Sequence, residues 1–158
     1  MFSSVSCGNF LYFLMKINII CIGKTEESYL REGIQKFLKR VSFYADVKFF
    51  ELKPEKSRDL AEKIKKVTRG YKILLDVGGK ELSSEQFAAL IQEKMNQGCP
   101  EIDFLIGGHS GFPLPVKEVA DLSISLSRCT FTHQMIRLLL LEQIYRAFTI
   151  LQGHPYHK

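Results

Sequence analysis

Apolar residues recur along the chain at two spacings, in short runs rich in apolar residues and in longer segments with apolar residues three or four positions apart. The short runs predict five β-strands, at residues 17–22, 47–52, 72–77, 102–106 and 122–126. The longer segments predict amphipathic helices, as in residues 30–41, where Leu30, Ile34 and Leu38 lie on one face. Repeated strand and helix units predict an α/β fold with a mainly parallel sheet that helices cover.

Local signals mark where several of these helices begin. Ser83 and Gln86 have the spacing of a capping box. Ser57 is expected to cap the helix after the second strand, with Val67 among the residues that face the core. Pro115 suits the first turn of a short helix. Each predicted strand is therefore followed by a helix.

The last helix, predicted from residue 133 onwards, is the longest apolar segment. Its apolar residues spread around the helix, at Met135, Ile136, Leu138, Leu139, Leu140, Leu141, Ile144, Tyr145, Phe148 and Leu151. Such a helix must be buried on more than one side. It is either a central core helix or a helix that also contacts a second copy of the chain. Its polar residues should then lie near other polar groups or a ligand, namely Gln134, Arg137, Glu142 and Arg146.

Composition places the chain among globular proteins. Its 46% hydrophobic and 25% charged residues are ordinary for one domain, and no apolar run is long enough for a membrane span. Residues 1–14 lack the positive start and the cleavage site of a signal peptide, and we interpret them as a peripheral extension before a domain of residues 15–158. The four cysteines have neither metal-site nor disulfide spacing, which predicts no bound metal and a cytoplasmic location.

Positive charge is concentrated in the first half of the chain. Residues 16–70 contain 14 of the 22 Lys and Arg residues but only 8 of the 17 Asp and Glu residues. The hypothesis of one surface that meets phosphates includes Lys36, Lys39, Arg40, Lys63, Lys65, Lys66 and Arg69. A solvated helix face is the commoner fate of such charges, so charge alone does not decide for a nucleic-acid partner.

Small residues end or follow three of the predicted strands, in the segments VGGK, GGHSGF and SRCTFTH. Ligands of parallel sheets bind beyond the carboxyl ends of the strands. GGHSGF lacks the Lys-Ser/Thr of a P-loop and the spacing of a GxGxxG motif. Three such segments at one edge predict a site for a nucleotide-like ligand.

Five segments together resemble a known family, and they read INIICIGK, LLDVGGK, DFLIGGHSGF, LSISLSRCTFTHQMIRLLLLEQIYRAF and HPYHK. The combination of an IGGxxG loop, an LSxxTFxHQMxR segment and a YHK end resembles the ribosomal RNA large subunit methyltransferase H family. These proteins are pseudouridine N3-methyltransferases of the SPOUT superfamily, and the resemblance covers residues 16–158. Thr132 stands where the family usually has proline, so a less rigid start of the last helix is expected.

The resemblance implies a fold, an assembly and a substrate. The fold is the SPOUT-type α/β domain with a C-terminal trefoil knot, although knots are essentially absent from proteins in general. The assembly is a homodimer built around the last helix. The substrate is N3 of a pseudouridine in helix 69 of 23S rRNA within the assembled ribosome, and neither a membrane nor a metal is implied.

The resemblance also implies residue roles. The methyl donor, S-adenosylmethionine, is expected to bind in the knot against Leu75, Gly107, Leu126, Ser127, Arg128, Cys129, Thr130 and Phe131. Four residues are expected to act on the acceptor: His157 to accept or relay the N3 proton, Tyr156 to stack on or orient the base, and Arg146, with Glu142 as its i,i+4 partner, to anchor the RNA backbone. Lys158 is expected to meet phosphate, and His133 and Arg137 are further candidates near the knot.

Two other classes of function compete with this interpretation. An RNA-binding or nucleotide-sensing module without chemistry would use the same basic half, but it has no need of three small-residue segments at one edge. A Rossmann-like dehydrogenase lacks both the GxGxxG motif and a ribose-binding acid after the first strand.

Overall fold

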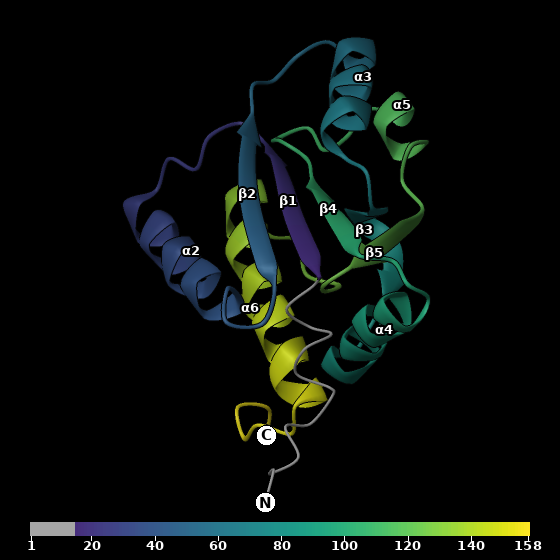
Figure 1. Cartoon of the computed structure of the whole chain (residues 1–158). Helices are drawn as coiled ribbons and strands as arrows, with labels where there is room; N and C mark the ends of the chain where they lie inside the picture. Colours follow the sequence, from purple (N-terminus) through teal and green to yellow (C-terminus); the bar gives the residue numbers. More distant parts are fainter. Residues whose placement is uncertain (1–14) are drawn as a thin grey trace, which may run out of the picture.

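The computed structural model describes residues 15–158, and the predicted extension of residues 1–14 lies outside this part. Its strands are β1 Lys16–Ile22, β2 Asp46–Leu52, β3 Tyr71–Glu81, β4 Glu101–Ile106 and β5 Leu122–Ser125. They form one parallel sheet in the order β2-β1-β4-β3-β5 (Figure 1). The predicted α/β fold with a parallel sheet is confirmed, and the trefoil knot stays a prediction.

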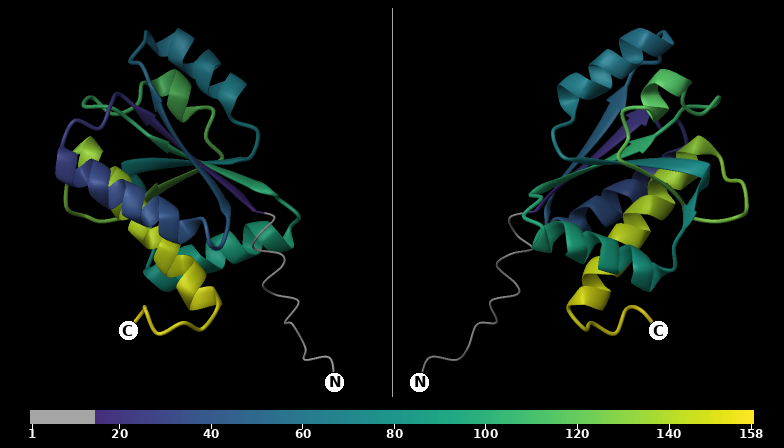
Figure 2. Two further views of the ribbon diagram at one scale, coloured as in Figure 1. Left: turned by 60° about the vertical axis from the view of Figure 1, so that its left-hand side comes forward. Right: turned by 90° about the vertical axis from the view of Figure 1, so that its right-hand side faces the viewer.

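Helices cover both faces of this sheet, and they are α2 Ser28–Val41, α3 Ser57–Val67, α4 Ser84–Asn96, α5 Leu114–Lys117 and α6 His133–Leu151. Helices α2, α4 and α6 lie on one face, and α3 and α5 lie on the other (Figure 2). Side chains of β1 alternate between the two sides. Ile19 and Cys21 join the larger core under α2, α4 and α6, whereas Ile20 and Ile22 join the smaller core under α3 and α5. This double burial explains why the strands read as continuous apolar runs.

The third strand is longer than predicted. β3 continues to Glu81 through the VGGK segment, and its pairing with β5 shifts register between Leu75 and Lys80. A Cβ at Gly79 would lie 2.6 Å from the backbone of Ile124, so only glycine lets the two strands approach here. The prediction of a loop was wrong because a Gly-Gly pair reads the same in a turn and in a bulged strand.

The predictions for the starts of α3 and α4 had different outcomes. The N-cap of α3 is Lys56, so the prediction that Ser57 caps this helix was wrong. Val67, in the last turn of α3, is 37% exposed and does not face the core as predicted. The capping box of α4 is confirmed, with Ser83 Oγ accepting from the Gln86 N–H at 3.2 Å and Gln86 Oε1 accepting from the Ser83 N–H at 2.9 Å.

α6 packs against the sheet between α2 and α4 (Figure 2). Its fully buried apolar residues are Leu140, Leu141, Ile144, Ala147 and Phe148. The interpretation as a central core helix therefore holds for this side. Met135, Leu139 and Ile150 remain half-buried on α6. They are part of the apolar surface that one chain does not cover completely.

The basic residues of the first half do not form one surface. Lys36 and Lys39 lie on α2, whereas Lys63 and Lys66 lie on α3. These two helices cover opposite faces of the sheet (Figure 2). The hypothesis of a single phosphate-binding surface made from all of these residues is therefore wrong within one chain.

Candidate functional site

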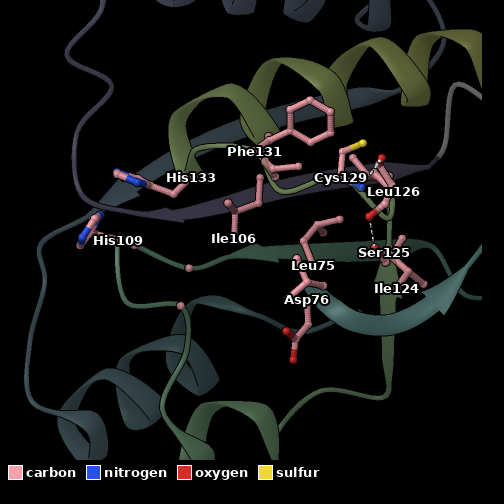
Figure 3. Close-up of a pocket in the computed structure, with 16 residues that line it drawn as sticks. Leu75, Asp76, Ile106, His109, Ile124, Ser125, Leu126, Cys129, Phe131 and His133 are labelled. Carbon is pink, nitrogen blue, oxygen red and sulfur yellow. Dashed lines mark hydrogen bonds between the residues drawn. The ribbon is translucent and has the colours of Figure 1, made fainter.

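A cavity of about 230 Å³ lies where the ligand site is predicted, at the carboxyl ends of β4 and β5 and beside residues 75–77 of β3, where the pairing of β3 with β4 ends (Figure 3). Its apolar walls are Leu75, Ile106, Ile124, Leu126, Phe131 and Ile136. The loop after β4 and the segment after β5 supply the remaining lining. Ligand binding at this edge follows the general rule for open parallel sheets.

Glycine backbone shapes the loop after β4. A Cβ at Gly107 would lie 2.8 Å from the carbonyl carbon of Gly111, and Gly111 itself has a φ of 68°. The Gly111 N–H donates to the Gly108 carbonyl oxygen at 3.0 Å. A side chain at either end of this loop would be strained, so the loop presents backbone to the cavity.

Most of the residues predicted to bind the cofactor line this cavity, namely Leu75, Gly107, Leu126, Ser127, Cys129 and Phe131. Arg128 and Thr130 do not line it. Arg128 Nε lies 3.7 Å from Glu81 Oε1 with its side chain 87% exposed, and Thr130 is exposed. Successive residues after Ser127 therefore alternate between solvent and cavity, which the family resemblance alone does not reveal.

Asp76 and His109 are polar residues of the lining that were not among the residues predicted to bind the cofactor. Lys117 Nζ donates to Asp76 Oδ2 at 2.6 Å, and this hydrogen bond is the main reason that the pKa of Asp76 lies below its usual value. The Asp76 carboxylate points away from the apolar wall in Figure 3. Asp76 lies within the third predicted strand and His109 follows the fourth, so closeness to the predicted carboxyl end of a strand was the only signal for either residue.

His109 and His133 face each other at the cavity, with ring centroids 6.3 Å apart in an edge-on arrangement (Figure 3). Burial is the largest cause that lowers the pKa of His133, and the positive charge of Arg137 adds to it. His133 is therefore neutral at neutral pH. Thr132 caps α6, because its Oγ1 accepts from the Met135 N–H at 3.2 Å. This cap fixes the helix start at the position where the family usually has proline.

Arg137 is fully buried and ties α6 to the ends of two strands. Its Nη1 donates to Thr25 Oγ1 at 2.8 Å and lies 3.3 Å from Glu51 Oε1, while its Nη2 donates to the Ile22 carbonyl oxygen at 2.9 Å. Its Nε has no hydrogen-bond partner among residues 15–158. The prediction that Arg137 lies near other polar groups is confirmed, and because the guanidinium is fully buried these groups belong to the chain itself.

The four residues predicted to act on the acceptor lie together at the C-terminal end of α6. Glu142 Oε1 accepts from Arg146 Nη2 at 2.5 Å and from the Tyr156 hydroxyl at 3.1 Å. Arg146 Cζ lies 4.9 Å from the centroid of the Tyr156 ring, and its Nη1 lies 3.3 Å from His157 Nδ1. His157 Nε2 lies 2.8 Å from Glu85 Oε1. We call these five residues, Glu85 included, the tail cluster.

Hydrogen bonding indicates how His157 and Tyr156 are protonated. A guanidinium only donates, so His157 Nδ1 accepts from Arg146 and Nε2 carries the hydrogen shared with Glu85. A hydrogen bond with Ser83 is the largest cause that lowers the pKa of Glu85 to about 2, and His157 contributes to it. Burial, followed by the charge of Glu142, raises the pKa of Tyr156. The hydrogen bonds of the cluster therefore assign a phenol that donates and a ring nitrogen that accepts.

The tail cluster does not line the cavity. His133 belongs to the cavity and Arg146 to the cluster, and both lie on α6. At 1.5 Å per residue the two are separated by roughly 20 Å along the helix axis. An acceptor that meets both groups must lie between them or bind across two subunits.

The cavity suits an adenosine-like group such as that of S-adenosylmethionine. Leu75, Leu126 and Phe131 provide flat apolar contacts for a purine, and the loop from Gly107 to Gly111 brings backbone amides and carbonyls to the edge. Asp76 supplies a carboxylate at the rim for a cationic ligand. The residues present therefore fit the expected methyl donor in shape and chemistry.

Metal sites and membrane spans were also considered for residues 15–158. No group of three or more His, Cys, Asp or Glu side chains within residues 15–158 is arranged to hold a metal ion. None of the helices in that range is long and apolar enough to cross a membrane. Free thiols occur there at Cys21, Cys99 and Cys129.

Sequence comparisons agree on one family. The family model described as "Predicted SPOUT methyltransferase" matches residues 15–157. Proteins named "Ribosomal RNA large subunit methyltransferase H" are 44% identical in Halothermothrix orenii and 43% identical in Carboxydothermus hydrogenoformans. Each of these alignments covers 91% of this chain and 100% of the relative.

Solved structures share the fold at low sequence identity. A probable methyltransferase from Bordetella pertussis Tohama I has a TM-score of 0.54 at 10% identity, over 85% of this chain and 96% of that one. A probable methylase family protein from Haemophilus influenzae Rd KW20 has a TM-score of 0.54 at 13% identity, over 92% of this chain and 72% of that one. These similarities support the fold and not the substrate.

Proposed function

This chain belongs to the SPOUT methyltransferase family, and on this basis we propose that it methylates N3 of a pseudouridine in helix 69 of 23S rRNA, with S-adenosylmethionine as methyl donor. The observation that carries the proposal is that proteins named as rRNA methyltransferases match this chain over their whole length. The cavity and the tail cluster, which both include residues of α6, support it. Ribosomes are the substrate in this proposal, which places the protein in the cytoplasm.

S-adenosylmethionine would supply an electrophilic methyl group. Leu75, Leu126 and Phe131 would contact its adenine ring, and the backbone at Gly107 and Ser127 would bind the polar edges of that ring. Closed apolar walls on one side of a reacting centre also exclude water. The chain's part at this end of the site is to bind and orient the donor.

Residues of the tail cluster would prepare the acceptor. N3 of the base loses its proton, a bond to the methyl carbon forms as the bond from sulfur to that carbon breaks, and a neutral thioether is left. His157 Nδ1 would take the N3 proton after Arg146, which donates to it in this structure, turns to the RNA backbone, and the Tyr156 hydroxyl would orient the base. Holding two reactants in attack geometry is worth roughly 7–11 kcal/mol, so positioning is expected to contribute most.

A transfer assay with ribosomes that lack the modification tests this function. We expect a labelled methyl group of S-adenosylmethionine to appear on N3 of one pseudouridine in 23S rRNA, with faster transfer on ribosomes than on a short RNA hairpin. Gly107→Val should weaken cofactor binding at least about tenfold in calorimetry, because its side chain would meet the Gly111 backbone. Gly78→Ala is the matched control, because a Cβ there has no atom within 4 Å.

Two results would contradict this function. Failure of the unchanged protein to bind S-adenosylmethionine would remove the methyl donor and favour an RNA-binding module without chemistry. A methyl group on another nucleotide would keep the enzyme class and exclude the proposed target.

We also propose a homodimer that forms through the outward side of α6. Met135 and Ile150 are apolar but only half-buried in one chain, and a second subunit would cover them. Sedimentation at micromolar concentration should give twice the chain mass. Met135→Glu should shift the protein to monomer, whereas the exposed Gln35→Glu on α2 should not. A monomeric unchanged protein would contradict the proposed assembly.

A further inference from the structure

A second cavity, of about 330 Å³, shares a wall with the cofactor cavity. The shared wall is formed by Ile124, Ser125, Leu126, Ser127 and Phe131, which line both cavities. The other walls come from the start of α4 and the middle of α6, and they include Ser84, Leu139 and Gln143. A ligand in the second cavity would therefore lie directly beside a ligand in the first.

Polar groups of the second cavity are placed on its α4 and α6 sides. Ser84 Oγ donates to Gln143 Oε1 at 2.8 Å, and Gln143 Nε2 donates to Glu142 Oε2 at 2.8 Å. A carboxamide has two N–H donors, and Glu142 takes one of them. The other donor of Gln143 is available to a ligand that enters between Leu126, Leu139 and Phe131.

The same side chains connect this cavity to the tail cluster. Gln143 is bonded to Glu142, which holds Arg146 and Tyr156. Ser84 precedes Glu85, which holds His157. None of these links reaches the cofactor cavity, which α6 lines with His133 and Ile136. Along α6 the second cavity therefore lies between the donor site and the groups expected to take the proton.

We propose that the second cavity receives the acceptor base, a uracil-type ring, and that Gln143 is a specificity-determining residue that donates to a carbonyl oxygen beside N3. This inference rests on the proposed function. Loss of the N3 proton spreads negative charge onto the two neighbouring carbonyl oxygens, so an N–H donor fixed at that position stabilises the reactive anion. Apolar contacts from Leu126, Leu139 and Phe131 suit the faces of a base taken out of its stack.

Substitution of Gln143 tests this assignment in the full-length protein with ribosomes as substrate. Gln143→Leu should lower kcat/KM for ribosomes about 100-fold, as expected for loss of one donor to a developing oxyanion, with cofactor affinity in calorimetry unchanged within about twofold. Gln143→Glu should lose as much, because a carboxylate repels the anion. Ser84→Ala frees one lone pair of the amide oxygen and should lower the rate less, by about tenfold. Gln35→Leu, an exposed glutamine on α2, is the matched control and should leave every value unchanged.

The outcomes separate this inference from the function on which it rests. In the proposed role the rate of Gln143→Leu recovers as pH rises, because N3 then loses its proton without the donor. A purely structural role through Glu142, which loses its bond to Gln143 in this variant, predicts a loss that is the same at every pH. A pH-independent loss would overturn the assignment. Equal losses of cofactor affinity and of rate in Gln143→Leu would also overturn it, and would place the second cavity in the donor site. Absence of methyl transfer by the unchanged protein would instead overturn the proposed function itself. Melting temperature and sedimentation of each variant establish that the fold and assembly are intact.

Discussion

Removal of residues 156–158 is expected to lower methyl transfer to ribosomes by about two orders of magnitude or more, the range typical of losing positioned acid and base groups. The deletion removes the Tyr156 hydroxyl from Glu142 and the His157 ring from Arg146 and Glu85. Cofactor affinity should change little, because neither cavity is lined by any residue of the deleted segment. Single-turnover kinetics on ribosomes and calorimetry with S-adenosylmethionine measure the two effects separately.

Single substitutions divide this effect among the three residues. Tyr156→Phe keeps the ring that packs on Tyr145 at a centroid distance of 4.7 Å and removes only the bond to Glu142. His157→Gln removes the imidazole, and we expect it to account for most of the loss. Deletion of Lys158 alone should raise KM for ribosomes and leave kcat unchanged. Full activity of the protein that lacks all three residues would show that the tail has no part in the chemistry.

Arg137→Ala is expected to reduce the free energy of unfolding by about 3 kcal/mol, within the range for breaking a buried ion pair. The substitution removes the hydrogen bond to the Ile22 carbonyl oxygen and the bond to Thr25, and it leaves a void where a fully buried side chain stood. Glu51 keeps its bonds with the N–H and hydroxyl of Thr25 and is partly exposed, which limits the cost of its lost partner. Urea unfolding at fixed protein concentration measures the change.

Two further variants identify the cause of this loss. Arg137→Met fills most of the space without a charge and should recover part of the stability, because buried ion pairs are often replaceable by apolar side chains. Arg31→Met, on the exposed surface of α2, should change stability by less than about 0.5 kcal/mol. A loss below about 1 kcal/mol in Arg137→Ala would mean that the strand ends and α6 hold together without this network.

Periodicity predicted most of the fold because the sheet is buried on both faces. The five predicted segments correspond to the five strands, and β1 and β4 read as nearly continuous apolar runs because a covered parallel strand has few polar positions. β2, at the edge of the sheet, carries the exposed Lys48 and Glu51 instead. The register shift in β3 escaped prediction, because its cause is the approach of Gly79 to Ile124. That contact joins residues far apart in sequence, and no local pattern contains it.

The residues of the candidate site also divide into those that the sequence predicted and those that it did not. Family resemblance placed Leu75, Leu126 and Phe131, and all three line the cavity. It did not distinguish Arg128, whose side chain points to solvent, from its neighbours. Asp76 and Glu85 were missed because their importance comes from Lys117 and His157, partners that only the folded chain brings within reach.

The position of α6 at the end of the chain has a consequence for biosynthesis. Five fully buried side chains of the larger core belong to this helix, and the helix packs against α2 and α4, which are made before it. A nascent chain therefore exposes the apolar face of its sheet until almost the last residue has left the ribosome. Pairings between segments distant in sequence form slowly, so this exposure outlasts synthesis itself. Limited proteolysis of ribosome-bound chains that end before and after α6 would reveal the interval in which the protein depends on chaperones.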